Sequence, residues 1–235
     1  MSPRFTSNAL RFGLAIGVAI AVVPATARVS AARITAAGLA ALMAKSLAGV
    51  QSFQVVNDSR STHATGSPGG VMKLHMVMVF VRQGKAITLS VQSNTDGRQS
   101  TMVYTGTRLC VQQDAHATWN CNLPVSYAKG FQANMDPIEA MKDSGTRMTG
   151  ISALGAKTIQ GQSCDGYSFT STLQSIHYQG HGSIWFSSAT GRLVEVTSVG
   201  SMVLTAGSAA MVTTGTVVYS RWNDPSLKLA AGPAS

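Results

Sequence analysis

The chain has 235 residues, of which 45% are hydrophobic and only 11% are charged. This composition supports a packed core and excludes an intrinsically disordered protein. The formal charge of +9 arises without a dense basic run or a basic patch interleaved with aromatic residues, so no nucleic-acid partner is expected. A modest positive charge of this kind fits transient contact with an anionic membrane surface.

The N-terminus has the pattern of a cleavable secretory signal. Arg4 and Arg11 precede an apolar run over residues 13–25, and the small-residue triplet 25–27 (Ala-Thr-Ala) completes the pattern. The run is too short for a regular transmembrane helix. We expect residues 1–27 to be removed, which lowers the charge from +9 to +7 by loss of the two arginines, and the mature chain to be exported to the periplasm, envelope or medium. A retained anchor and a second cut after Ala31 are the alternatives.

Residues 28–229 are expected to form one domain, and residues 230–235 a loose tail. The first element is a predicted helix over Ile34–Gly49, with Thr35 as N-cap. Leu39, Leu42, Met43 and Leu47 recur at spacings of three and four along it. One face of this helix is therefore apolar and should pack on a sheet.

From residue 51 onward the hydrophobic period changes to two, which predicts strands. The predicted strands are 51–57, 71–82, 86–93, 100–105, 107–113, 118–122, 157–163, 166–174, 180–188, 192–204 and 211–221, with a polar loop at 58–70. Asp96-Gly97 and residues 188–191 are predicted hairpin turns. A short second helix is expected over residues 136–142. The fold class is mainly β (α+β): a strongly curved antiparallel sheet, or unclosed half-barrel, with both helices on its concave face.

Three cysteines follow the signal, and an exported chain can form a disulfide. If Gln113 faces Thr118 across the loop 114–117, Cys110 lies opposite Cys121, nearly within disulfide range. We expect this bridge, with two reduced buried thiols as the alternative. Cys164 is then left over as a buried small hydrophobe.

Catalytic patterns are weak in this chain. The string Gly161-Gln162-Ser163-Cys164-Asp165 lacks the final glycine of a nucleophile elbow. His177 and His181 are four apart, but on a strand that spacing is about 13 Å, too far to share one metal ion. The nine carboxylates are scattered. We therefore expect no enzyme, no cofactor and no metal, although a site assembled from distant residues would escape this reading.

Apolar residues dominate the strand at 71–81, which implies cover on both of its faces. The chain also contains 11 methionines, whose flexible side chains suit a deformable apolar surface. The alternative is that these residues only fill the core. The side chains predicted to line an apolar ligand cavity are Leu74, Met76, Met78, Phe80, Leu89 and Trp185, with Ile138 and Met141 on the second helix.

The order of these features resembles the LolA-like superfamily, which includes periplasmic lipoprotein carriers, and more closely the lipid-carrier lipoproteins of the LppX and LprG type. The resemblance covers residues 34–229 and consists of short structural strings. These strings are residues 48–53 (AGVQSF), 84–87 (GKAI), 96–97 (DG), 104–107 (YTGT), 119–121 (WNC), 166–169 (GYSF), 185–186 (WF), 190–194 (TGRLV) and 219–225 (YSRWNDP).

The resemblance implies an unclosed barrel with helices across its concave face and a cavity for acyl chains. It implies a non-catalytic protein, expected to be a monomer, whose partner is a lipid or an acylated protein. LppX and LprG type proteins usually carry a lipid-anchored N-terminal Cys, which this sequence does not place at either cleavage site. An envelope interaction module with a filled core is the second hypothesis, and an exported hydrolase the third.

Overall fold

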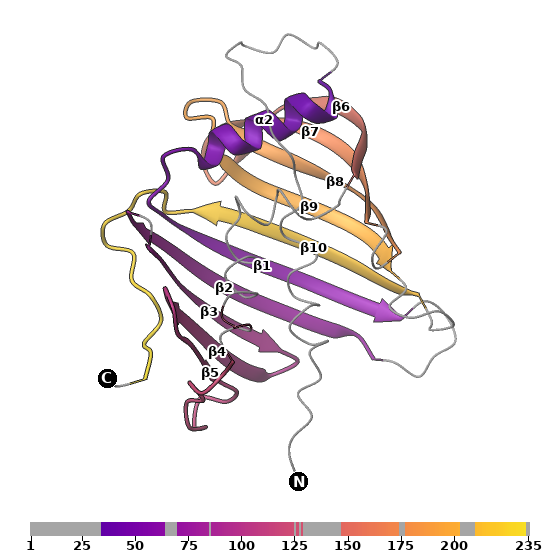
Figure 1. The fold of residues 1–235 in the computed structure, drawn as a ribbon. Helices are drawn as coiled ribbons and strands as arrows, with labels where there is room; N and C mark the ends of the chain where they lie inside the picture. Colours follow the sequence, from indigo (N-terminus) through magenta and orange to yellow (C-terminus); the bar gives the residue numbers. More distant parts are fainter. Residues whose placement is uncertain are drawn as a thin grey trace.

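The computed structural model describes residues 34–63, 70–84, 86–124, 126, 128, 147–173, 177–202 and 210–233, and the statements below concern these residues. They form one helix and ten strands. In chain order these are α2 (Ala36–Leu47), β1 (Ser52–His63), β2 (Met72–Gln83), β3 (Ala86–Thr95), β4 (Arg98–Thr105), β5 (Leu109–Gln112), β6 (Arg147–Ile159), β7 (Gln162–Leu173), β8 (Tyr178–Ser187), β9 (Leu193–Met202) and β10 (Met211–Ser220) (Figure 1). The predicted signal and the predicted helix 136–142 lie outside the described residues.

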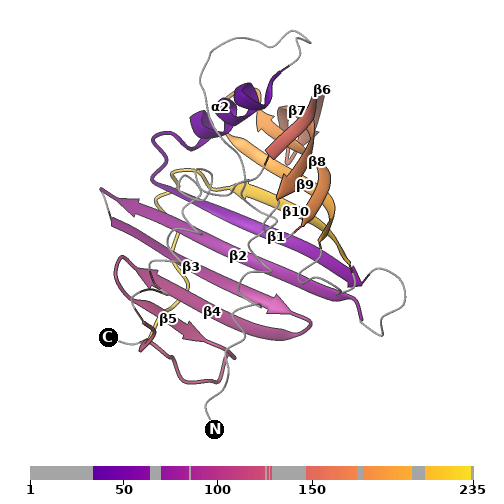
Figure 2. The same ribbon diagram turned by 45° about the vertical axis from the view of Figure 1, so that its right-hand side comes forward.

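All ten strands form one antiparallel sheet in the order β5-β4-β3-β2-β1-β10-β9-β8-β7-β6. The sheet consists of two five-stranded meanders, which join where β1 pairs with β10 over Gln54–His63 and Met211–Ser220. In Figure 2 strands β6–β8 rise steeply from the plane of β1–β5, so the sheet is strongly curved. β5 and β6 are its two edges, and the predicted unclosed, mainly β fold with an N-terminal helix is confirmed.

The N-terminal helix has the predicted cap. The Thr35 side chain accepts a hydrogen bond from the Gly38 N–H (3.1 Å), and the Ala48 N–H closes the other end on the carbonyl of Ala44. Leu39, Met43 and Leu47 are buried, as their spacing predicted. α2 lies against β6 and β9. No helix in the described part of the chain is both long and apolar enough to cross a membrane.

The predicted turn at Asp96-Gly97 is confirmed between β3 and β4. Both residues have positive φ, 51° and 87°, as a two-residue type I′ hairpin requires. The turn predicted at residues 188–191 likewise joins β8 to β9.

Several predicted strand boundaries are wrong where the strands are polar. β1 continues to His63 through residues predicted as a loop, because Ser61 finds a buried partner in Thr213 (2.9 Å between the hydroxyls). β6 begins at Arg147 rather than residue 157, and the turn to β7 lies at Gln160-Gly161. The predicted strand 118–122 is reduced to a single bridge between Asn120 and Val111.

The cysteine pairing is as predicted. Cys110 and Cys121 form a disulfide with 4.1 Å between their Cα atoms, and Cys164 is free and buried. The neighbouring bridge, Val111 with Asn120, has the register obtained by placing Gln113 opposite Thr118. Pairing the residues on either side of the four-residue loop, and continuing that pairing backward, was therefore sufficient to identify the disulfide.

Alternate side chains divide the sheet into two faces. We call the face that packs on α2 the helix face, and the other the open face. The main hydrophobic cluster lies on the helix face and extends from β4 and β5 to β7, with Met102 and Tyr104 near one end and Tyr167 and Phe169 at the other. The helix face is therefore apolar across both halves of the sheet.

Candidate functional site

The helix face brings together five of the residues predicted to line a ligand cavity. Met76, Met78 and Phe80 follow one another on the inward positions of β2, and Leu89 is paired with Phe80 on β3. All four are at most 9% exposed. Leu74 is partly buried and packs against the same cluster.

The other three predicted lining residues are not part of this cluster. Trp185 lies on the open face in a small separate cluster with Ile159, Cys164 and Val194. Its indole covers Gly166 so closely that a Cβ there would meet the ring at 2.3 Å. Ile138 and Met141 lie outside the described residues.

Sequence reasoning missed much of the helix face. The missed members include Val55, Val91, Ile184, Val196 and Val217, which are buried in the same cluster. Their signal was the alternation within each strand, but strand alternation alone does not tell which alternate set faces the helix. The pairing of β1 with β10, which aligns Val55 with Tyr219, settles that question.

Aromatic rings gather on the helix face at the end of the sheet where α2 leads into β1. Phe53 stacks on Phe80 and Trp222, with ring centroids 4.9 and 5.2 Å apart, and Trp222 stacks on Tyr219 at 6.0 Å. Burial raises the pKa of the Tyr219 hydroxyl far above its ordinary value. These rings form a compact apolar end to the cluster.

Arg192 holds the C-terminal end of α2. Its guanidinium donates to the backbone carbonyls of Ser46 and Ala48, the second at 3.2 Å, and lies 5.7 Å from the centroid of Trp222. A cation at this position also interacts favourably with the helix dipole. The helix is therefore fastened to the start of β9 by one side chain.

The segment after β10 holds the connection between α2 and β1. The Asn223 side chain accepts from the Gln51 N–H (2.7 Å), and the Asn223 N–H donates to the Ser52 carbonyl (2.8 Å). Three of the strings behind the resemblance, at residues 48–53, 190–194 and 219–225, thus meet at one end of the sheet. They position α2 and carry no catalytic group.

Buried polar side chains gather toward the other end of the helix face, beside the buried pair Met202 and Met211. Asn57, Ser61 and Thr213 are buried there, and Tyr178 lies over Gly180 and Gly200. Burial raises the pKa of the Tyr178 hydroxyl, although hydrogen bonds with Ser171 and Ser198 oppose the shift. The helix face therefore changes along its strands, from a wholly apolar end near α2 and Trp222 to an end where polar and apolar side chains are buried together.

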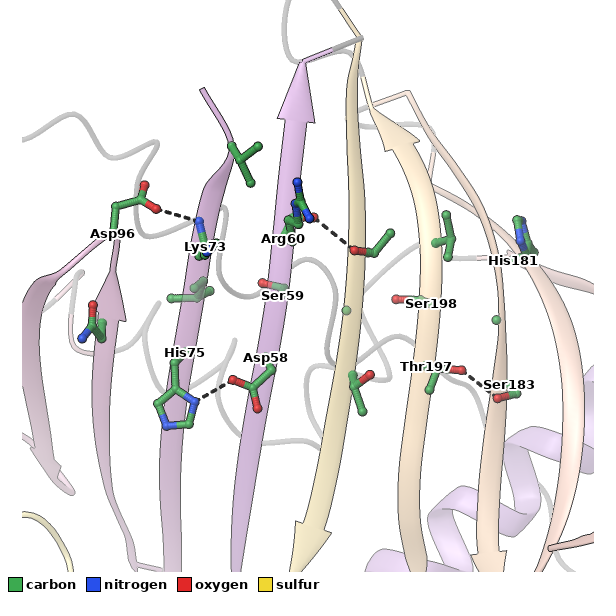
Figure 3. Close-up of a pocket in the computed structure, with 18 of the residues that line it drawn as sticks. Asp58, Ser59, Arg60, Lys73, His75, Asp96, His181, Ser183, Thr197 and Ser198 are labelled. Carbon is green, nitrogen blue, oxygen red and sulfur yellow. Dashed lines mark hydrogen bonds and ion pairs between the residues drawn. The ribbon is translucent and has the colours of Figure 1, made fainter. Parts of the chain in front are cut away.

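The open face carries a hollow of about 1270 Å³ across β1, β2, β10, β9 and β8 (Figure 3). On β1 and β2, Asp58 and His75 are directly opposite each other with 2.6 Å between Oδ1 and Nδ1. Arg60 and Lys73 form the next pair on the same face. His181 lies on the far side, on β8.

These groups do not assemble into a metal site or a nucleophilic site among the described residues. No three His, Cys, Asp or Glu side chains of the described segments converge on one point. Within those segments, no Ser or Cys is hydrogen-bonded to His75, whose ring is 55% exposed. Burial raises the pKa of the Cys164 thiol, which disfavours the thiolate.

Comparison with known proteins gives matches in structure but not in sequence. No protein-family model matches the chain, and no curated protein matches it significantly. Among solved structures, the lipoprotein LppX of Mycobacterium tuberculosis matches with a TM-score of 0.49 and 17% identity, over 80% of this chain and 94% of LppX. A DUF1329 family protein from Desulfovibrio piger matches with a TM-score of 0.30 and 11% identity, over 77% of this chain and 89% of that one. LppX is of the type that the sequence resembles.

Proposed function

We propose that this protein is an exported, non-catalytic carrier that binds the acyl chains of lipids or lipoproteins between α2 and the helix face of its sheet. One observation carries the proposal: the apolar layer of the helix face is continuous over both halves of an unclosed sheet, and α2 lies over its β6 and β9 side. In the described chain, α2 covers part of this layer, and Leu123 and Ala128 from the segment after β5 also pack against it. The C-terminal end of α2 is held by the Arg192 side chain. Displacing α2 would open the layer to an apolar guest without breaking any β-ladder.

Burial of an acyl chain can supply enough free energy for binding without polar recognition of the ligand. Burying each CH₂ group contributes about 0.8 kcal/mol, so a 16-carbon chain offers on the order of 10 kcal/mol before ordering costs. Methionine side chains at Met76, Met78 and Met102 can repack around chains of different shape. The polar end near Asn57 and Tyr178 would then face a headgroup.

Export is supported by the disulfide between Cys110 and Cys121, since such bonds persist in oxidising compartments. The signal pattern of residues 1–27 points the same way. We therefore place the carrier outside the cytoplasmic membrane, acting as a monomer with a lipid or an acylated protein as partner.

A second function is favoured by one feature of the helix face. Its central residues Leu39, Leu89 and Ile184 are fully buried, which also suits an envelope interaction module whose core is filled by its own side chains. The two functions differ in whether the face opens to admit an acyl chain.

Titration with a fluorescent fatty acid, whose emission rises in an apolar environment, separates the two. Met76→Gln and Met78→Gln place an amide of similar size in the apolar layer and should weaken binding about tenfold or more, since desolvating the amide costs at least 1–3 kcal/mol. Val77→Gln is the control, because Val77 lies between Met76 and Met78 on the same strand but on the open face, outside the cluster. Absence of uptake by the wild-type protein, or equal binding by all variants, would favour the interaction module.

A further inference from the structure

Two cations stand directly opposite each other in the hollow of the open face. Arg60 on β1 is the register partner of Lys73 on β2, and the next outward pair along these strands is Asp58 with His75. Directly opposed side chains have Cβ atoms about 4.5–5.5 Å apart, and like charges at that separation destabilise a sheet. The arrangement therefore has an energetic cost that a bound anion would remove.

The nearby carboxylates do not neutralise this pair. Asp58 is engaged by the His75 ring, and the Asp96 carboxylate accepts from the backbone N–H of Lys73 (2.8 Å). Among the described carboxylates, none forms an ion pair with the Arg60 or Lys73 side chain. Both side chains are exposed, with their charged groups free to converge on a ligand.

The walls of the hollow combine hydroxyl groups with apolar surface. Thr214 and Thr216 are the outward residues of β10, and Ser183 pairs with Thr197 at 2.7 Å on the neighbouring strands. Val71 and Val199 also line the hollow, and they are two of the three exposed large hydrophobic residues of the described chain. A cavity of about 1270 Å³ is far larger than one oxyanion needs.

We infer that this hollow is a second binding site, which takes a phosphate-bearing amphiphile with its phosphate between Arg60 and Lys73. The guanidinium can donate two parallel hydrogen bonds to phosphate oxygens, while the ammonium adds a point charge. The apolar part of the ligand lies against Val71 and Val199. This site is on the opposite face from the proposed acyl-chain layer and does not depend on it.

Calorimetric titration of the full exported protein with a short-chain phosphatidic acid tests the inference. Short-chain diacylglycerol lacks the phosphate, and inorganic phosphate lacks the apolar part. The double variant Arg60→Gln/Lys73→Gln should bind phosphatidic acid at least about tenfold more weakly than wild type. Diacylglycerol should bind far more weakly than phosphatidic acid.

Arg108→Gln/Arg147→Gln is the matched control. It removes the same two positive charges from exposed positions outside the hollow and should leave affinity nearly unchanged. All titrations are repeated in a Met76→Gln/Met78→Gln background, where acyl-chain binding on the helix face is weakened. The loss caused by Arg60→Gln/Lys73→Gln and the preference for phosphatidic acid over diacylglycerol should persist there, which separates this site from the helix face. If inorganic phosphate binds and its binding depends on Arg60 and Lys73, a free phosphate compound is sufficient as the ligand. If inorganic phosphate does not bind, the apolar part of the amphiphile is required as well.

Three results would overturn the inference. These are no binding of phosphatidic acid by the wild-type protein, equal losses in the two double variants, and equal affinity for diacylglycerol and phosphatidic acid in the Met76→Gln/Met78→Gln background. In chloride buffer the melting temperature of Arg60→Gln/Lys73→Gln should equal or exceed that of wild type, because the two opposed charges are removed, and that of Arg108→Gln/Arg147→Gln should match wild type. These measurements check that each variant is folded.

Discussion

The thiol of Cys164 is the most sheltered titratable group on the open face. It is fully buried beside Trp185, and burial raises its pKa. We expect no alkylation of the native protein by iodoacetamide at neutral pH, and one thiol per chain modified in denaturant without reductant. Mass spectrometry counts the added groups. Three modified thiols in denaturant would show that Cys110 and Cys121 are not paired.

Asp224 stabilises the segment that holds the start of β1. Hydrogen bonds from the side chains of Ser226 and Arg221 lower its pKa from 3.8 to about 2. A carboxyl with a depressed native pKa stabilises the fold fully above its unfolded pKa and loses that contribution as pH falls toward the native value. Asp224→Asn should therefore be less stable than wild type at pH 7.

The difference between the two proteins should shrink between about pH 4 and pH 2, where wild-type Asp224 becomes protonated. Urea denaturation at several pH values measures it. A difference that stays constant over this range would show that the ionised carboxylate is not the cause. Asp114→Asn is the control, because Asp114 is an exposed carboxylate on a loop distant in sequence from Asp224.

Among the elements, α2 depends on a single side chain at its C-terminal end. Arg192→Gln removes the charged donor to the carbonyls of Ser46 and Ala48, and hydrogen bonds of charged groups contribute about 1.5–3 kcal/mol. We expect a loss of stability of that order and faster amide hydrogen exchange in α2, with β3 unaffected. Arg108→Gln should change neither quantity. An equal increase in amide exchange rate in α2 and β3 would indicate that α2 does not open separately from the sheet.

The disulfide stabilises the β5 end of the sheet, where the segment after β5 makes only one bridge to it. Replacing both Cys110 and Cys121 by Ser should cost roughly 2–3 kcal/mol, since the bond closes a short loop. Thermal unfolding followed by circular dichroism measures the loss. An unchanged melting temperature would mean that the bond adds nothing to this edge.

At the scale of the whole molecule, the sequence predicts the strands that have one buried face and fails on those that do not. β2 was readable because Lys73 and His75 alternate with Leu74 and Met76, and a run of apolar strand formers continues to Val81. β6 has thirteen residues that are almost all exposed or small, so its sequence carries no periodic signal and most of it was missed. The end of β1 is polar because its inward residues pair with hydroxyls rather than apolar groups.

The candidate site was predictable in part for the same reason. The even-numbered residues of β2 from Leu74 to Phe80 share a face by strand alternation, and the pairing of Phe80 with Leu89 adds β3 to that face. Trp185 could not be assigned, since Ile184, Trp185 and Phe186 are all buried and a continuous apolar run does not indicate which face a residue points to. The hollow was not foreseen, because Arg60 and Lys73 become neighbours only through the pairing of β1 with β2.

The central claim is that the helix face opens to hold an acyl chain. Native mass spectrometry of the protein purified from an exporting host, followed by organic extraction and lipid identification, tests it most directly. We expect a stoichiometric acyl-bearing adduct that is lost when Met76 and Met78 are both replaced by Gln and kept in the Val77→Gln control. A bare protein mass in repeated preparations, with no uptake of added lipid, would contradict it.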